Sequence, residues 1–341
     1  MSPKPKLNSI RSFYTIFFIC FSVSSFVGFT QSPTPDLFIE SNIALIQYGS
    51  AVASAGDING DGYGDVIVGT KYYTNVETNE GKIEIYLGSA VGISPLPSTV
   101  IESNLPNTYY GNSVACAGDI NNDGFDDVIV GAYLYDNGQT NEGAVYIYHG
   151  SALGLTIVPA IILESNQASA QFGRSVSTAG DINNDGFDDV LIGSDAYTNG
   201  QTYEGRTFVY HGSAAGIGIT PNATMESNLV NASFGRSVAG LGDVNADGFD
   251  DIIVGSPNYT NGHSQEGRAY IYHGTATGIN TVPITVMENN KALSYLGFSV
   301  SGAGDVNNDG YFDVVLGAYN ADNLQDGEGF VYIHYGSASG I

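Results

Sequence analysis

The sequence predicts an all-β fold, a β-propeller of four-stranded antiparallel blades, and three observations lead to it. One acidic segment, Asp-x-Asn-x-Asp-Gly-x-x-Asp, recurs five times, with starts at Asp57 and Asp119 that are 62 residues apart and the same spacing thereafter. Each repeat holds four short apolar runs separated by turn residues. No apolar pattern of period 3.6 is long enough for a helix, and four short strands per repeat are typical of a propeller blade.

The repeat organises nearly the whole chain. The five repeats are predicted at about 35–96, 97–158, 159–220, 221–282 and 283–341. In the second repeat we expect strands within 113–117, 127–131, 144–148 and 160–164, where β-branched and aromatic residues gather between glycine and asparagine turns. A calcium-loaded β-solenoid is the alternative, but its repeats are far shorter.

The two ends of the array bear on closure of the propeller. A proline in register begins each fourth-strand segment, and the first copy, Pro35 to Ser41, precedes the first acidic loop. The N-terminal strand could therefore complete the last blade and close a five-bladed ring without sheet edges. The alternative, a fragment of a longer array, is equally compatible with the sequence.

Composition excludes some classes of partner. The chain carries 35 acidic and 10 basic residues, a formal charge of -25, and such a field repels nucleic acid and anionic membranes. The acids are bunched in the recurring loops, and bunched carboxylates require counter-ions. Only Cys20 and Cys116 could pair, and Cys20 lies in the leader, so we expect no internal disulfide in the mature chain.

The first 30 residues read as a signal peptide. Basic Lys4, Lys6 and Arg11 precede an apolar run over 13–29, and small residues come before a cut ahead of Gln31. An uncleaved N-terminal anchor is the alternative. Either reading predicts a secreted or cell-surface protein, with no further membrane span.

The acidic loop predicts one calcium ion per repeat. Side-chain oxygens at positions 1, 3, 5 and 9, and the backbone carbonyl of position 7, form an oxygen set suited to a hard cation, while glycine at position 6 permits the sharp turn. Position 12 is apolar and no helix flanks the loop, which excludes an EF-hand; Mg²⁺ is disfavoured because it demands stricter octahedral geometry. The predicted ligands are Asp57, Asn59, Asp61, Tyr63, Asp65; Asp119, Asn121, Asp123, Phe125, Asp127; Asp181, Asn183, Asp185, Phe187, Asp189; Asp243, Asn245, Asp247, Phe249, Asp251; and Asp305, Asn307, Asp309, Tyr311, Asp313.

These motifs resemble the FG-GAP repeat of the integrin α-subunit N-terminal propeller. In the second repeat the resemblance rests on Tyr110-Gly111, then Ala117-Gly118 with the acidic loop, then Val130-Gly131-Ala132. It implies a β-propeller with calcium in the hairpin between strands 1 and 2 of each blade, and a role in adhesion or ligand binding. Integrin propellers have seven blades and this sequence has five repeats, so we expect a secreted, integrin-like propeller and not an integrin subunit.

A protein or carbohydrate partner is predicted to meet the face opposite the acidic loops. Segments between strands 2 and 3 combine aromatic rings with amides, a mixture suited to recognition, although ordinary polar loops look the same. The candidate contacts are Tyr73, Tyr135, Tyr197, Tyr259, Asn137, Asn199 and Asn261.

We expect no catalytic residues in this chain. The histidines mostly share one repeat column, as strand-end packing residues would, and no nucleophile setting is recognisable. The alternative function is the non-catalytic propeller domain of a secreted hydrolase or lyase.

Overall fold

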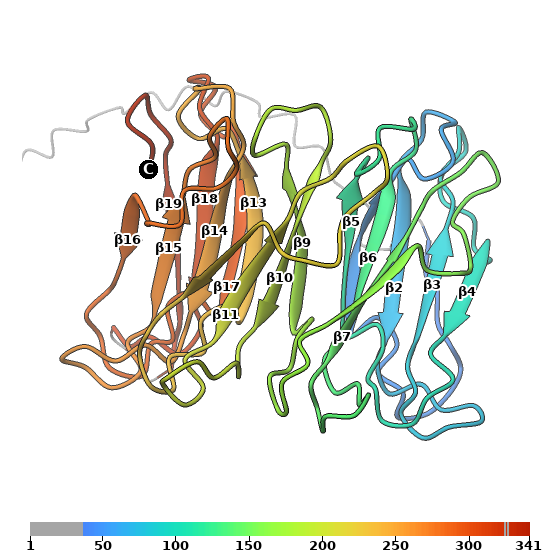
Figure 1. The fold of residues 1–341 in the computed structure, drawn as a ribbon, viewed down its shortest axis with the longest axis horizontal. Coiled ribbons are helices and arrows are strands. Elements are labelled where there is room, and N and C mark those ends of the chain that lie inside the picture. Colours follow the sequence, from blue (N-terminus) through green and yellow to red (C-terminus); the bar gives the residue numbers. More distant parts are fainter. Residues whose placement is uncertain (1–36, 324, 326) are drawn as a thin grey trace, which may run out of the picture. The chain divides into compact units, whose positions relative to one another are not determined.

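The computed structural model describes residues 37–323, 325 and 327–341. These residues form five antiparallel sheets, one per repeat (Figure 1). The predicted signal peptide, residues 1–30, lies outside the described residues. Four sheets have four strands in meander order, and the fifth has three. The described residues contain no helix. The all-β, propeller-type fold predicted from the repeat is therefore confirmed.

The same strand position recurs in every sheet. The first strands are β1 (Ala51–Gly56), β5 (Ser113–Gly118), β9 (Ser175–Gly180), β13 (Ser237–Gly242) and β17 (Ser299–Gly304). The second strands are β2 (Asp65–Thr70), β6 (Asp127–Ala132), β10 (Asp189–Ser194), β14 (Asp251–Ser256) and β18 (Asp313–Ala318). The third strands are β3 (Lys82–Tyr86), β7 (Ala144–Tyr148), β11 (Arg206–Tyr210), β15 (Arg268–Tyr272) and β19 (Phe330–His334). The fourth strands are β4 (Thr99–Glu102), β8 (Ile161–Glu164), β12 (Ala223–Glu226) and β16 (Thr285–Met287).

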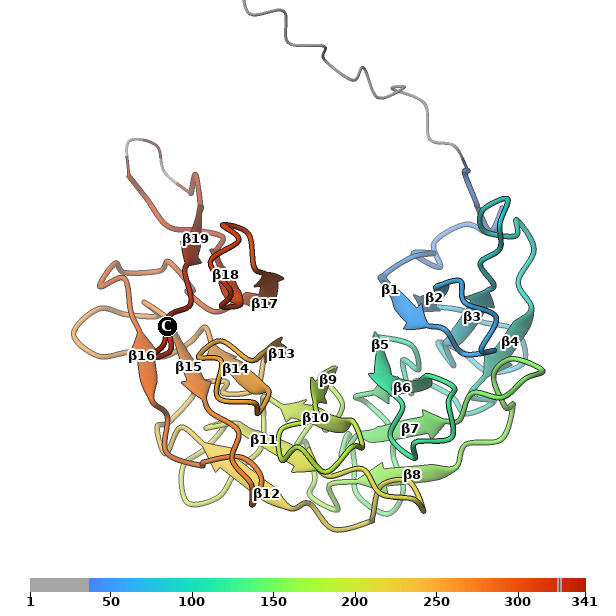
Figure 2. The ribbon, with the colours of Figure 1, turned by 90° about the horizontal axis from the view of Figure 1, so that it is seen from above.

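The hydrophobic core lies between neighbouring sheets. Every residue of β6, β10 and β14 is buried, which explains why these strands read as continuous apolar runs and not as alternating ones. One core cluster joins Ile67 and Ile85 of the first sheet to Val128 and Tyr146 of the second. Successive sheets pack through their first strands, which lie innermost in Figure 2.

The glycines of the two repeated motifs allow neighbouring sheets to approach closely. A Cβ atom on Gly131 of β6 would collide with the carbonyl of Gly173, at the start of the next sheet. Gly173 has a φ of 80°, which favours glycine, and its N–H donates to Gly193 O at 3.1 Å. The motifs thus mark the points where backbone meets backbone across sheets.

The fifth sheet differs from the other four on its outer face. Val331 and Ile333 of β19 are 72% and 55% exposed, whereas the equivalent Val145 and Ile147 are fully buried by the following sheet. The first strands of successive sheets pack against each other, but among the described residues β17 and β1 do not pack in this way.

Closure of a ring by the N-terminal strand is not seen. Residues 37–40, which stand in the register of a fourth strand, belong to no strand, and the fifth sheet ends at β19. The predicted segment begins at residues 35 and 36, which lie outside the described residues, so closure of the ring stays a prediction.

Loops emerge on two faces. The acidic loops between first and second strands meet the loops between third and fourth strands, as where Ser151 N–H donates to Ile58 O at 3.0 Å. The other face, which we call the tyrosine–asparagine face, carries the 2–3 loops (71–81, 133–143, 195–205, 257–267) and the 4–1 loops (103–112, 165–174, 227–236, 288–298). No helix long and apolar enough to cross a bilayer occurs in the described part of the chain.

Candidate metal loops and ligand face

Each acidic loop winds around its own side-chain oxygens. In the first loop, Asp57 Oδ1 accepts the N–H of Asp61 at 3.1 Å, and Asp57 Oδ2 accepts the N–H of Gly62 at 2.8 Å. Asn59 Oδ1 also accepts Asp61 N–H at 3.0 Å, and Asp61 Oδ1 accepts Tyr63 N–H at 3.0 Å. The other four loops repeat this pattern. Positions 1, 3 and 5 therefore converge, and metal binding by them stays a prediction.

The turn at position 6 requires glycine. Gly62 and Gly124 have φ values of 87° and 90°, and the three later copies lie close to these values. A side chain at such an angle is strained. Glycine at position 6 thus lets the chain turn back, so that the backbone of position 7 lies beside the carboxylate of position 5.

The carboxylate of position 9 is more enclosed than those of positions 1 and 5. Asp127 is fully buried, its Oδ2 accepts Ile120 N–H at 3.2 Å, and its Oδ1 accepts Gly150 N–H at 2.9 Å. Burial raises the pKa of Asp127 to about 7, although these two hydrogen bonds oppose the shift. The carboxylates of Asp123 and Asp119 add to the increase. Position 9 therefore ties the acidic loop to the end of the third strand in every repeat.

The donor chemistry of these loops fits a hard cation. Positions 1, 3, 5 and 9 of each loop combine three aspartates with one amide, and in the described residues no lysine or arginine forms an ion pair with them. In that part of the chain, no three His, Cys, Asp or Glu side chains are grouped so that they could hold a metal ion by themselves. The oxygen set is thus a mixed one, in which amide and backbone oxygens must supplement the acids.

Two histidines of the repeat column lie against the acidic loops. His149 Nδ1 is 3.3 Å from Asn121 Nδ2, and His273 Nδ1 is 3.1 Å from Asn245 Nδ2. The same asparagine amides donate to the aspartates of position 5. These histidines help to orient the position 3 amide, a packing role that agrees with their place at strand ends.

Three of the four tyrosines predicted to contact a ligand pack under basic side chains, and the fourth packs against another tyrosine. Arg268 lies 3.6 Å from the ring centroid of Tyr259, which is 4% exposed, and Arg206 lies 4.1 Å from that of Tyr197. In the first blade, Lys82 lies 4.5 Å from the ring of Tyr73. In the second, Tyr135 meets Tyr146 edge-on at 6.3 Å.

The asparagines of the same prediction connect two acids. Asn137 N–H donates to buried Glu142 Oε1 at 2.7 Å, and Asn137 Nδ2 donates to Glu164 at 3.1 Å. Asn199 repeats this arrangement, and Asn261 N–H donates to Glu266. The tyrosines and asparagines thus make packing and hydrogen-bond contacts within the protein. Their contact with a ligand stays a prediction.

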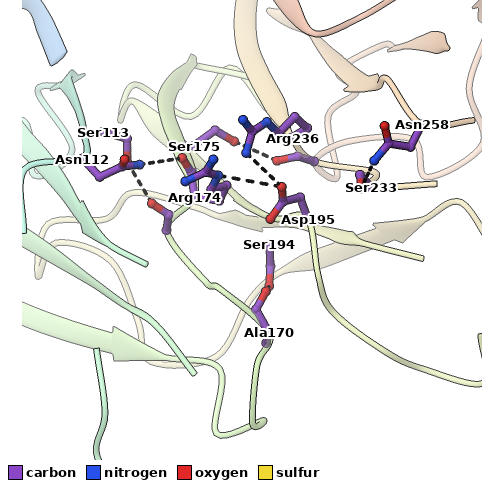
Figure 3. Close-up of polar contacts among 12 residues, drawn as sticks. Asn112, Ser113, Ala170, Arg174, Ser175, Ser194, Asp195, Ser233, Arg236 and Asn258 are labelled. Carbon is purple, nitrogen blue, oxygen red and sulfur yellow. Dashed lines mark hydrogen bonds and ion pairs between the residues drawn. The ribbon is translucent and has the colours of Figure 1, made fainter. Parts of the chain in front are cut away.

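The tyrosine–asparagine face holds a second group of side chains that the sequence did not single out. Asp195, at the start of a 2–3 loop, lies between Arg174 and Arg236, with nitrogen-to-Oδ2 distances of 3.8 and 3.2 Å (Figure 3). Arg174 also lies 4.5 Å from the ring centroid of Tyr133. Asp195 stands in a column that has no common residue, with Lys71, Tyr133, Pro257 and Tyr319 in the other repeats, so periodicity gave no signal for it.

A family profile described as FG-GAP repeat matches the chain five times, at residues 48–86, 111–148, 172–210, 234–272 and 296–334. These matches cover more than half of the chain, and each contains the first three strands of one sheet.

Integrin α-subunits are among the similar curated proteins. Integrin alpha-5 of Xenopus laevis is 32% identical over 248 residues, covering 70% of this chain and 22% of its own length. Integrin alpha-V of Gallus gallus is 35% identical over 225 residues, covering 63% and 20%. The chain thus spans about a fifth of the length of these relatives.

One solved structure, an exotype rhamnogalacturonan lyase, YesX, aligns with 86% of this chain and 56% of its own. The TM-score is 0.40 and the identity 14%, a likeness too weak to carry an argument.

Proposed function

Because the chain belongs to the FG-GAP repeat family, we propose that it is an exported β-propeller that binds an extracellular protein or carbohydrate, with calcium as a structural metal. The observation that carries the metal proposal is the fivefold convergence of oxygen donors at positions 1, 3 and 5 without a cationic partner. Residues 1–30 would direct export as a signal peptide.

Calcium would be held by positions 1, 3, 5, 7 and 9 of each loop. When bound, it supplies positive charge that neutralises three carboxylates and fixes the hairpin between first and second strands. In the second loop Asp119, Asn121 and Asp123 would bind through side-chain oxygens and Phe125 through its carbonyl. Asp127 would bind the ion while it also accepts hydrogen bonds from the backbone N–H groups of Ile120 and Gly150.

The metal has a structural part to play because this chain has few other cross-links. Cys116 is the one free cysteine of the described residues, so no disulfide supports the sheets there. A bound ion that favours the folded state adds stability in proportion to its affinity and concentration.

The ligand would meet the tyrosine–asparagine face. Integrin-like relatives support a role in adhesion or ligand binding, and the loops of this face supply the aromatic and amide groups that recognition surfaces use. Tyr73, Tyr135, Tyr197 and Tyr259, with Asn137, Asn199 and Asn261, would frame this surface.

We propose a binding role without catalysis. The histidines at positions 149, 211 and 273 lie at equivalent strand ends, and the pKa values of His211 and His273 are lowered by burial. Repetition of the same environment differs from the single asymmetric centre that catalysis needs. The second candidate, a propeller domain within a hydrolase or lyase, would use the same loops for binding.

Thermal unfolding with and without chelator tests the metal proposal. The chain, freed of the predicted leader, is melted in calcium, in magnesium and in excess EDTA. We expect EDTA to lower Tm markedly and calcium, more than magnesium, to restore it. An unchanged Tm in EDTA would refute the structural role of the ion.

A further inference from the structure

The tyrosine–asparagine face contains one large hollow. Its volume is about 830 Å³, within the range of small-molecule sites, and loops of the second, third and fourth blades line it. Its walls include Gln171, Asp195, Tyr203, Ser233 and Asn258. A smaller hollow next to it shares Asp195 and Ser233 and adds Arg236.

The hollow lies where the third and fourth repeats lack an aromatic ring that the second and fifth repeats have. Gln171 and Ser233 stand in the column that holds Tyr109 in the second repeat and Tyr295 in the fifth, while the first repeat has Gln47 there. Tyr109 packs against its neighbour Tyr133, and Tyr295 stacks on Tyr319 with centroids 5.2 Å apart. Those rings occupy the space that the third and fourth repeats leave open.

Tyr203 departs from the repeat in the opposite sense. The equivalent positions hold Asn79, Asn141 and Gln265, and all four residues have φ near 50°. Asparagine adopts this left-handed conformation readily, and Tyr109 and Tyr295 adopt it elsewhere in this chain. Tyr203 is 47% exposed and has no aromatic or cationic neighbour among the contacts of the described residues. An exposed ring at the rim of a hollow is available to stack on a ligand.

Asp195 supplies an unsatisfied acceptor in the wall of the hollow. It is 9% exposed, and its Oδ2 faces Arg174 and Arg236, as Figure 3 shows, whereas no described residue donates a hydrogen bond to its buried Oδ1. Lys71, Tyr133, Pro257 and Tyr319 fill its column in the other repeats. Buried oxygens without donors are rare, and such an atom beside a cavity invites a donor from a ligand.

The lining favours one class of ligand. Asp195 is the only acidic or basic residue in the lining, and the two arginines that pair with it do not line the large hollow; the remaining walls offer amides and hydroxyls. An anionic ligand would find no basic side chain in the lining of the large hollow, whereas a sugar offers hydroxyl donors and an apolar ring face. We propose that this hollow binds an uncharged carbohydrate, with a sugar hydroxyl donating to Asp195 Oδ1 and the sugar ring stacking on Tyr203. The inference rests on the proposed function, because it places the ligand on the same face.

An array of neutral, uronate-containing and sulfated oligosaccharides, probed with the calcium-loaded chain, tests this assignment. The chain is made in a host without N-glycosylation, since Asn231 and Asn258 line the hollow and stand in Asn-x-Ser/Thr sequences. Affinity for the strongest neutral oligosaccharide is then measured by titration calorimetry for the unaltered chain and for three variants.

Two of the three variants use residues that the repeat already accommodates, and the third is a control. Ser233→Tyr places in the hollow the side chain of Tyr109 and Tyr295, whose φ values of 54° and 53° match the 55° of Ser233, so folding is preserved and binding is abolished. Tyr203→Asn restores the residue of the other repeats and weakens binding about tenfold, through loss of the stacked ring. Val76→Ala, on an exposed 2–3 loop of the first blade, leaves affinity within about twofold.

The outcomes separate this inference from the proposed function. Neutral oligosaccharides that bind the unaltered chain but not Ser233→Tyr support it. Binding of charged glycans alone, or neutral binding that survives Ser233→Tyr, overturns the hollow as the site while the face remains a binding surface. An array on which no oligosaccharide binds overturns the carbohydrate assignment. If the chain still binds immobilised extracellular-matrix proteins in calcium, the proposed function stands. If the chain binds neither oligosaccharides nor these proteins, the carbohydrate assignment and the proposed function both fail.

Discussion

Asp126 Oδ2 accepts a 2.7 Å hydrogen bond from the backbone N–H of Asp57, which lies 69 residues earlier, in the acidic loop of the preceding blade. Asp126 N–H in turn donates to Asp57 O at 3.2 Å. Asp188 and Asp250 make the same pair of bonds with Asp119 and Asp181. Position 8 of the acidic loop is therefore a clamp between blades.

Asp188→Ala should destabilise the fold by about 1.5 kcal/mol, because a carboxylate hydrogen bond across the blade interface is lost at a partly exposed site. The shift in urea midpoint, measured in saturating calcium, reports this cost. Gly64→Asp is the matched control: a side chain at Gly64 meets no atom within 4 Å, so stability should stay within about 0.5 kcal/mol. Equal effects of the two changes would refute the clamp.

A single acidic loop should contribute one ion and a fraction of the metal-dependent stability. Asp123→Ala removes an oxygen donor and the acceptor for Phe125 N–H, so calorimetry should show one site fewer than in the unaltered chain. The fall in Tm should be smaller than the fall caused by EDTA, since four loops remain intact. An unchanged stoichiometry would show that the second loop binds no calcium.

Cys116 should react slowly in the folded chain. Burial raises the pKa of its thiol to about 12, and the carboxylates of Asp126 and Asp188 add to the increase, although Gly118 N–H opposes it. Because the thiolate is the reactive form, alkylation by iodoacetamide at pH 8 should be about a hundredfold slower than in the urea-unfolded chain. Mass spectrometry of the peptide containing Cys116 measures both rates. Comparable rates would place the thiol in contact with solvent.

The strands and acidic loops could be predicted because five copies of one pattern reinforce each other. A single Asp-rich turn is ambiguous, but glycine at position 6 and aspartate at position 9 recur with the same φ and the same hydrogen bonds. The role of position 8 could not be predicted, because its partner lies 69 residues away and depends on how blades pack.

The ligand face was harder to predict for a related reason. An aromatic ring in a polar loop looks the same whether it awaits a ligand or packs beneath an arginine, as Tyr259 does under Arg268. Tyr203 is more informative, because the same position holds an amide in Asn79, Asn141 and Gln265, whereas Asp195 stands in a column that has no common residue. Residues that recur in every repeat are thus recognised as structural, and the non-recurring ones are those to test for function.

A buried glutamate anchors each 2–3 loop of the first four blades. Glu80, Glu142, Glu204 and Glu266 are fully buried, and each Oε1 accepts the backbone N–H of the asparagine five residues earlier, at 2.7 Å for Glu142 and Asn137. Leaving that N–H without an acceptor carries a desolvation penalty of about 1–3 kcal/mol, and the lost side chain adds a cavity.

Glu142→Ala should therefore destabilise the chain by about 3 kcal/mol, measured as a shift in urea midpoint. Glu142→Gln keeps an acceptor oxygen at the same place and should cost less than half as much. Gln139→Ala, in the exposed part of the same loop, serves as the control and should be nearly neutral. If glutamine were as damaging as alanine, the negative charge of Glu142 and not its hydrogen bond to Asn137 would hold the loop.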